Sequence, residues 1–136
     1  MSEAVRKERR EFRNIHVTQI ARYRMPLSAI VSILHRISGA LIFLLLPVAL
    51  YLLDRSLTSE TSFDYFKGII SHGFVKLVLL ALAWAYLHHF CAGIRHLLMD
   101  KHFALSKEGA RRTAAVTLVI SLLLTALVAL KLFGAF

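Results

Sequence analysis

Residues 37–53 read ISGALIFLLLPVALYLL, a run that contains no Asp, Glu, Lys or Arg. Two more uncharged runs follow, over residues 77–94 and 113–130. Each run approaches the ~20 apolar residues that a helix needs to cross a ~30 Å hydrocarbon core. None of them shows the polar stripe that a helix of a soluble bundle would carry. The sequence therefore predicts an all-α integral membrane protein with three transmembrane helices.

The amino-acid composition also supports a membrane protein, and it excludes several other classes of protein. The chain has 136 residues, of which 57% are hydrophobic, and a formal net charge of +9. This length is one domain's worth, so a multidomain enzyme with its own cofactor-binding fold is excluded. A soluble domain this small could not bury so much apolar surface, and disorder is excluded by the same composition. The single cysteine, Cys91, cannot form an internal disulfide, a CxxC metal pair or a CxxCH haem-attachment motif.

We expect a basic N-terminal arm followed by one membrane domain. Pro26 suits the first turn of a helix, and Pro47 predicts a kink inside the same helix. The polar stretch over residues 54–67 is expected to be turn-like. The expected parts are an arm over residues 1–25 and a three-helix membrane domain over 26–136, with helices at about 26–53, 68–99 and 109–134.

The distribution of Lys and Arg predicts the orientation in the membrane. Seven lie in residues 1–24, two in the loop over 54–67 and five in residues 95–112. The positive-inside rule therefore places the N-terminus and second loop in the cytoplasm, and the first loop and C-terminus outside. Because these charges are juxtamembrane, lipid headgroups and topology explain them, and no nucleic-acid partner is expected.

Two polar clusters interrupt the apolar runs, and ionisable residues inside spans are expensive and usually functional. The deeper cluster contains adjacent histidines, His88 and His89. His89 lies six residues from Arg95, about 9 Å into the membrane, where a neutral imidazole needs a partner such as a haem iron. Small residues share the face of His89, whereas His88 is turned ~100° away, toward Trp84. We therefore favour His89 as an axial haem ligand, with a hydrogen bond between helices as the alternative.

The second cluster is Ser32-Ile33-Leu34-His35-Arg36. Ser32 and Arg36 are four residues apart, so they share a helix face and could bind one polar ligand at the membrane surface. The alternative is that Arg36 anchors the helix to headgroups while His35 points into water.

A haem with two axial ligands requires a partner subunit, because no other histidine of the chain lies at the depth of His89. The bundle is therefore expected to be heteromeric, with the second ligand supplied by another chain. Four basic residues nearer the cytoplasmic surface are placed to meet anionic propionates. They are His35, Arg36, Arg95 and His96, of which Arg95 is the one most readily explained as a simple anchor.

The stretches SILHRISG over 32–39 and HFCAGIRHLLMD over 89–100 resemble the two motif regions of the cytochrome b membrane-anchor subunit of succinate dehydrogenase. The order of the motifs, the three spans and the orientation also match, from Arg22 onward. The sequence departs from the family's frequent Arg-Pro pair, because it reads Arg24-Met25-Pro26. After Asp100 it reads Lys-His rather than a small residue.

The resemblance implies a subunit of respiratory complex II, which acts in electron transport and the tricarboxylic acid cycle. It implies a flavoprotein, an iron–sulfur protein and a second small membrane anchor as partners, in a bacterial inner membrane. Ser32 and Arg36 correspond to quinone-site residues, and ubiquinone would be the substrate. His89 corresponds to the axial ligand of haem b, shared with the partner anchor, whereas His35 and Arg36 resemble propionate partners, which His96 is expected to join because of its position near the cytoplasmic surface. No residue of this chain would oxidise succinate, and the chain alone would be inactive.

Three alternatives stay open at this stage. A quinol:fumarate reductase anchor would share the fold and partners but run the reaction in reverse. A haem-free structural membrane subunit would use the polar clusters only to hold helices together. A dihaem form would use His72, near the outer surface, as a further ligand.

Overall fold

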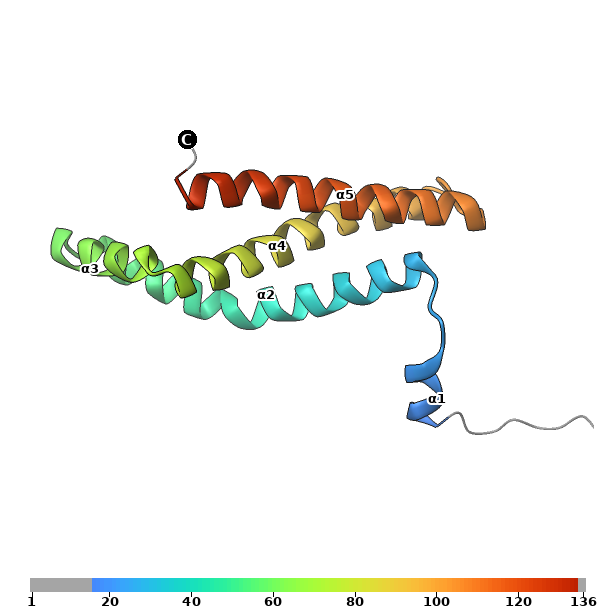
Figure 1. The fold of residues 1–136 in the computed structure, drawn as a ribbon, viewed down its shortest axis with the longest axis horizontal. Coiled ribbons are helices and arrows are strands. Elements are labelled where there is room, and N and C mark those ends of the chain that lie inside the picture. Colours follow the sequence, from blue (N-terminus) through green and yellow to red (C-terminus); the bar gives the residue numbers. More distant parts are fainter. Residues whose placement is uncertain (1–15, 135–136) are drawn as a thin grey trace, which may run out of the picture.

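The computed structural model describes residues 16–134, and it is built from helices alone over that range. Figure 1 shows the long helices side by side, with one short helix ahead of the first long helix and another between the first and the second. Residues 1–15 of the expected N-terminal arm, and residues 135–136, lie outside the described part. The helices are α1 (Val17–Arg22), α2 (Leu27–Leu57), α3 (Glu60–Ser71), α4 (Gly73–Asp100) and α5 (Lys107–Leu132). The predicted all-α membrane fold is confirmed.

The three long helices contain the three uncharged runs, and all are long and apolar enough to cross a membrane. Helix α2 starts after Pro26 and runs through Pro47, which lacks the N–H for one helical hydrogen bond. It extends to Leu57, beyond the expected end near residue 53. Helix α4 begins at Gly73, later than the expected residue 68, because α3 occupies the preceding segment.

Helix α3 was not expected, and the prediction of a turn-like loop over 54–67 was wrong. The Ser59 side chain accepts from the Ser62 N–H, and the Ser62 hydroxyl accepts from the Ser59 N–H. This reciprocal cap satisfies two N–H groups at the start of the helix. Glu60, in the first turn, places a negative charge near the positive end of the helix dipole, which stabilises the helix.

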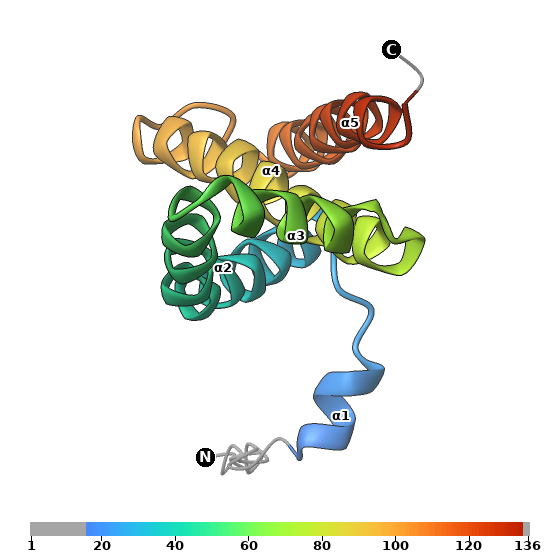
Figure 2. The same cartoon turned by 90° about the vertical axis from the view of Figure 1, so that its left-hand side faces the viewer.

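Helix α1 lies apart from the long helices, as Figures 1 and 2 show. His16 caps its N-terminus together with Gln19. Tyr23–Pro26 then connect it in extended backbone to α2.

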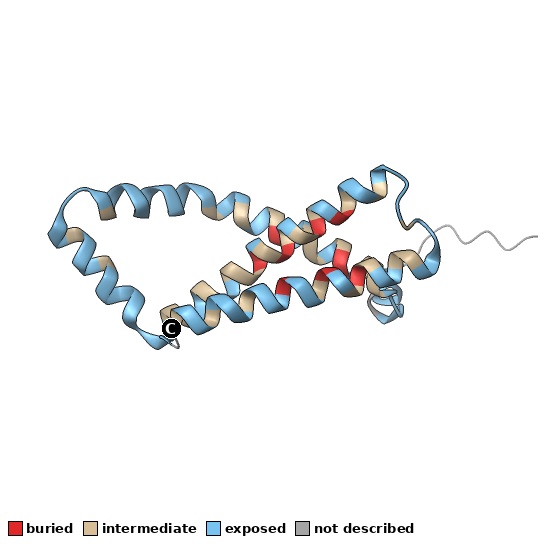
Figure 3. Ribbon diagram, turned by 90° about the horizontal axis from the view of Figure 1, so that it is seen from above, coloured by how far each residue is buried: buried red, intermediate tan, exposed pale blue. Residues whose placement is uncertain are grey.

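Helix α4 packs against both α2 and α5, and α2 also contacts α5. Figure 3 shows that the buried residues gather where these helices cross. The buried side chains are mostly small or polar, which lets the backbones approach closely, as is typical of membrane bundles. They are Val31, Ser38, Ala85, His88, Ala92, Arg95, Ala114, Thr117 and Ser121. Most large apolar side chains, in contrast, face outward, where only lipid or a partner chain could cover them.

Candidate functional site

The predicted ligand His89 lies on α4 at the crossing with α2. Its Nδ1 atom is 3.0 Å from the main-chain carbonyl oxygen of His35 and 3.5 Å from Oγ of Ser38. A carbonyl oxygen only accepts hydrogen bonds, so Nδ1 carries the hydrogen and Nε2 keeps its lone pair. This is the tautomer that a metal-binding imidazole adopts when its other nitrogen is held by a backbone carbonyl.

Close approach of the two helices at this point depends on Gly39. A Cβ atom built on Gly39 would lie 2.7 Å from Cε1 and 3.0 Å from Nδ1 of His89, closer than real Cβ contacts. The Ser38 hydroxyl beside it donates to the His35 carbonyl at 3.0 Å. Sequence reasoning did not single out Ser38 or Gly39. Their position three and four residues after His35, on one helix face, was the available signal.

His35 and His96 join His89 in a cluster of three imidazoles. The His35 ring stacks on the His89 ring with centroids 4.2 Å apart and an interplanar angle of 10°. The His96 ring lies 4.9 Å from the His35 ring. The His35 ring also packs against α4 at Gly93, where a Cβ would be in ordinary contact with Nε2 of His35 at 3.6 Å. The structure therefore brings together the three histidines that the sequence analysis selected, from α2 and α4.

Ser32 and Arg36 lie one turn apart on α2, flanking this cluster. Ser32 is half-buried and Arg36 is exposed. Within residues 16–134, neither side chain makes a hydrogen bond or an ion pair. Helical spacing puts Ser32 about 20° and Arg36 about 60° from Gly39 around α2, so both lie near the side of the helix that faces His89. They are therefore free to bind a polar group that reaches this side of α2.

His88, the neighbouring alternative ligand, is buried inside the helix bundle. Its exposed fraction is 0%, and its ring lies 5.4 Å from the Trp84 ring. Neither ring nitrogen of His88 has a hydrogen-bond partner in the described part of the chain. Because the three helices enclose it, a macrocycle brought by another chain could not reach it.

Arg95 differs from its expected role as a simple surface anchor, because its exposed fraction is only 5%. Its Nε donates to Oγ1 of Thr113 at 3.1 Å, and its Nη2 donates to the carbonyl oxygen of Ala110 at 3.2 Å. Arg95 therefore fastens α4 to the first turns of α5. It does not point toward the histidine cluster with His96.

His72 lies at the other end of α4, in the N-cap position, and its side chain makes no capping hydrogen bond. It is 17 residues from His89, or about 25 Å along a helix. Among the described residues, no group of three or more His, Cys, Asp or Glu side chains is arranged so that it could hold a metal ion, and this includes the cluster of His35, His89 and His96. A metal at His89 must therefore arrive with other donors.

Three apolar helices of spanning length define a multi-pass membrane protein. A family model described as the succinate dehydrogenase/fumarate reductase transmembrane subunit matches residues 10–128. The chain belongs to this family.

Several relatives carry a more specific name. The chain is 40% identical over 103 residues to the succinate dehydrogenase cytochrome b556 subunit of Coxiella burnetii, covering 75% of this chain and 82% of the relative. It is 30% identical over 105 residues to the subunit of the same name in Rickettsia felis, covering 77% and 82%. The corresponding subunit of Paracoccus denitrificans is 29% identical over 111 residues, covering 82% and 85%. These relatives are subunits of succinate dehydrogenase, an oxidoreductase complex.

Proposed function

We propose that this chain is the membrane-anchor cytochrome b subunit of a succinate dehydrogenase, and that it holds haem b through His89. The observation that carries the proposal is the orientation of the His89 imidazole. Its Nδ1 donates a hydrogen bond to the His35 carbonyl oxygen, and its Nε2 makes no hydrogen bond within residues 16–134. The names of the relatives support the same function.

The residues around His89 fit a haem. Gly39 lets the backbone of α2 approach the His89 ring closely, which fixes the orientation of the imidazole. A haem supplies one-electron chemistry when bound. His35, Arg36 and His96 are the cationic or hydrogen-bonding groups that would hold its propionates at the membrane surface. A partner anchor subunit would supply the second ligand, since no further histidine of residues 16–134 is left to bind the other side of a haem held by His89.

Ser32 and Arg36 would form this chain's part of a ubiquinone site. During reduction, negative charge develops on the quinone oxygens, and a nearby guanidinium stabilises it electrostatically. Ser32 adds a small hydroxyl that can donate to a carbonyl oxygen. Arg36 directly follows His35 of the imidazole cluster, and Ser32 lies three residues before it.

The succinate chemistry belongs to other subunits in this proposal. A flavoprotein would oxidise succinate, and an iron–sulfur subunit would pass the electrons to quinone at the cytoplasmic face of a bacterial inner membrane. The N-terminus would lie in the cytoplasm and the C-terminus in the periplasm, as the Lys and Arg distribution predicts. The chain alone would have no activity.

The amount of haem in the purified complex tests the proposal. A pyridine haemochrome assay should give one haem for each copy of this chain. No haem would favour a purely structural membrane subunit, and two would favour a dihaem form that also uses His72. The ratio of ubiquinone reduction to menaquinol oxidation by the complex separates succinate dehydrogenase from a fumarate reductase, and faster menaquinol oxidation would favour the latter.

A further inference from the structure

Helix α3 has a polar side and an apolar side. Its charged side chains and one serine fall within about 60° around the helix axis. They are Glu60, Asp64, Lys67 and Ser71, which we call the polar face. Its large aliphatic and phenylalanine side chains fill a separate sector of about 120°. They are Phe63, Phe66, Ile69 and Ile70, which we call the apolar face. A helix with this pattern is stable where it meets an apolar surface on one side and water on the other.

The rest of the bundle covers only part of the apolar face. Helix α3 contacts α2 and α4, and Phe66 is half-buried there. Phe63, Ile69 and Ile70 stay exposed. Three large apolar side chains gathered on one helix face gain free energy when an apolar phase removes them from water. The exposed part of the apolar face therefore calls for a covering from outside this chain.

The connections of α3 fix its depth in the membrane. Two residues join it to α2, and one residue, His72, joins it to α4. The uncharged run of α2 ends at Leu53, four residues before the helix ends, and the uncharged run of α4 begins at Leu77, four residues after that helix begins. Four helical residues extend about 6 Å. The headgroup layer on each side of a ~30 Å hydrocarbon core is ~5–8 Å thick. Both ends of α3 therefore lie in the layer where lipid meets water.

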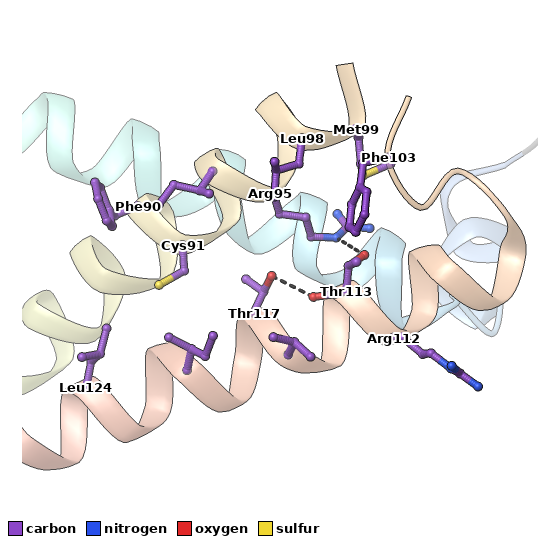
Figure 4. Close-up of a pocket in the computed structure, with 13 residues that line it drawn as sticks. Phe90, Cys91, Arg95, Leu98, Met99, Phe103, Arg112, Thr113, Thr117 and Leu124 are labelled. Atoms are coloured by element: carbon purple, nitrogen blue, oxygen red, sulfur yellow. Dashed lines mark hydrogen bonds between the residues drawn. The ribbon is translucent and has the colours of Figure 1, made fainter. Parts of the chain in front are cut away.

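The direction of α3 suits this layer. Figure 2 looks along the bundle and shows α3 running across it, from the end of α2 to the start of α4. A helix that crosses the bundle at this depth can turn one side toward acyl chains and the other toward water. An apolar groove of about 460 Å³ between α4 and α5 lacks such a constraint (Figure 4), and nothing in the structure shows what covers it.

The neighbouring turns of the spanning helices also expose large apolar side chains at this end of the bundle. Leu53 and Leu57 are exposed on α2, and Phe74 and Leu77 are exposed on α4. Both helices are of spanning length, so the acyl chains around them are the apolar phase nearest to α3. Lipid that surrounds these turns would reach the apolar face of α3 without a break.

We propose that α3 is an interfacial helix, whose apolar face inserts among the upper acyl chains of the bilayer while its polar face meets water. Tyr65, beside the apolar face, has the aromatic ring and polar tip that are typical of membrane–water interfaces. The polar face carries two carboxylates, Glu60 and Asp64, and one ammonium group, Lys67. Insertion therefore relies on apolar contact and not on attraction to anionic headgroups. The proposal does not depend on haem or quinone binding.

Photocrosslinking tests the orientation of α3 in the intact complex, reconstituted in phosphatidylcholine vesicles. One variant carries Phe63→p-benzoylphenylalanine, on the apolar face. The matched control carries Asp64→p-benzoylphenylalanine, the next residue, about 100° away on the polar face. Mass spectrometry measures the lipid adducts on this chain. We expect the yield at position 63 to exceed that at position 64 about tenfold, the preference of a phenylalanine side chain for apolar surroundings over water.

A second pair, Ile70→p-benzoylphenylalanine and Ser71→p-benzoylphenylalanine, repeats the test two turns further along and covers the case in which a change near the start of α3 unfolds it. Position 70 should give the higher lipid yield. Equal lipid yields at positions 70 and 71, or no lipid adduct at either position 63 or position 70, would overturn the proposal. Crosslinking of positions 63 and 70 mainly to another polypeptide would also overturn it, because a protein partner would then cover the apolar face. A complex without haem that keeps the lipid contrast would overturn the proposed function and leave the interfacial helix standing.

Discussion

The Nδ1 atom of His89 in α4 lies 3.0 Å from the main-chain carbonyl oxygen of His35 in α2. This bond joins two membrane-spanning helices and fixes which nitrogen of His89 is unprotonated. The acceptor is backbone, so replacing the His35 side chain would not remove it. The packing of α2 against α4 therefore sets the orientation of His89. Substitutions that change this packing should change the orientation of the imidazole.

Replacing His89 should remove the haem. In the purified complex, we expect His89→Ala to abolish or shift the haem absorption bands, because the imidazole held for the iron is lost and His88, the nearest in sequence, is enclosed by the helices. Absorption spectroscopy of the complex is the measurement. His88→Leu is the matched control, one residue away, and should keep the spectrum. A normal spectrum in His89→Ala, or loss of the haem only in His88→Leu, would show that the ligand was assigned to the wrong residue.

Gly39→Ala should move the His89 ring without changing the chemical identity of the ligand. The added methyl would sit 2.7 Å from the His89 ring, so either the ring rotates or α2 moves away from α4. We expect a change in the haem midpoint potential and in its electron paramagnetic resonance spectrum. Gly68→Ala, in α3, is the control, since a Cβ there meets nothing within 4 Å. If both variants keep the parent potential and spectrum, the Gly39 contact has no role in positioning His89.

Much of the fold could be predicted from the sequence, because three uncharged runs of near-spanning length leave few structures that satisfy the backbone in lipid. Helix α3 escaped prediction for a local reason. Its apolar content is modest, and its start depends on the reciprocal hydrogen bonds of Ser59 and Ser62, which a polar sequence does not reveal by periodicity.

The candidate site was predictable in part. Helical spacing separates His89 from His88 by ~100°, and the structure places His88 inside and His89 at the open edge. The role of Arg95 was harder to predict, because a basic residue near the end of a membrane helix is typical of an interfacial anchor. Its role depends on Thr113 and Ala110, which only the packing of α5 brings to it. Gly39 likewise matters through a contact between helices that no spacing along one helix specifies.

Arg36→Ala should separate the two halves of the reaction. The guanidinium is exposed and unpaired within residues 16–134, so its loss should leave the folding of the helices unchanged, and His35 and His96 would still be present to hold the propionates. Quinone reduction by the complex should fall, because the charge that develops on the quinone oxygen loses a stabilising partner. Succinate oxidation with an artificial dye should be unaffected. Equal loss of both activities would count against a quinone role, and Arg55→Ala, exposed near the far end of α2, serves as the surface control.

Arg95→Gln should destabilise the bundle by releasing α5. The variant loses two hydrogen bonds from a charged donor, each worth about 1.5–3 kcal/mol, and leaves the Thr113 hydroxyl without this partner. Thr113→Val removes one acceptor and should give a smaller loss. Thermal unfolding of the purified complex in detergent, followed by circular dichroism, measures both. Arg111→Gln, an exposed neighbour on α5, should have no effect. If Arg95→Gln unfolds no earlier than Arg111→Gln, the two hydrogen bonds do not fasten α5.

His88→Leu should make the protein more stable. His88 is fully buried, and neither of its ring nitrogens makes a hydrogen bond of good geometry in the described part of the chain, so its interaction with the Val31 backbone compensates their desolvation only in part. An unpartnered buried polar group costs about 1–3 kcal/mol, and leucine of similar volume removes that cost while keeping the contact with Trp84. The midpoint of thermal unfolding should rise, with the haem spectrum unchanged. His88→Asn, which stays polar but is smaller, should not produce the gain. A lower midpoint in His88→Leu would mean that the ring nitrogens are bound by a group such as an internal water, and that the imidazole is a structural hydrogen-bonding residue of the three-helix core.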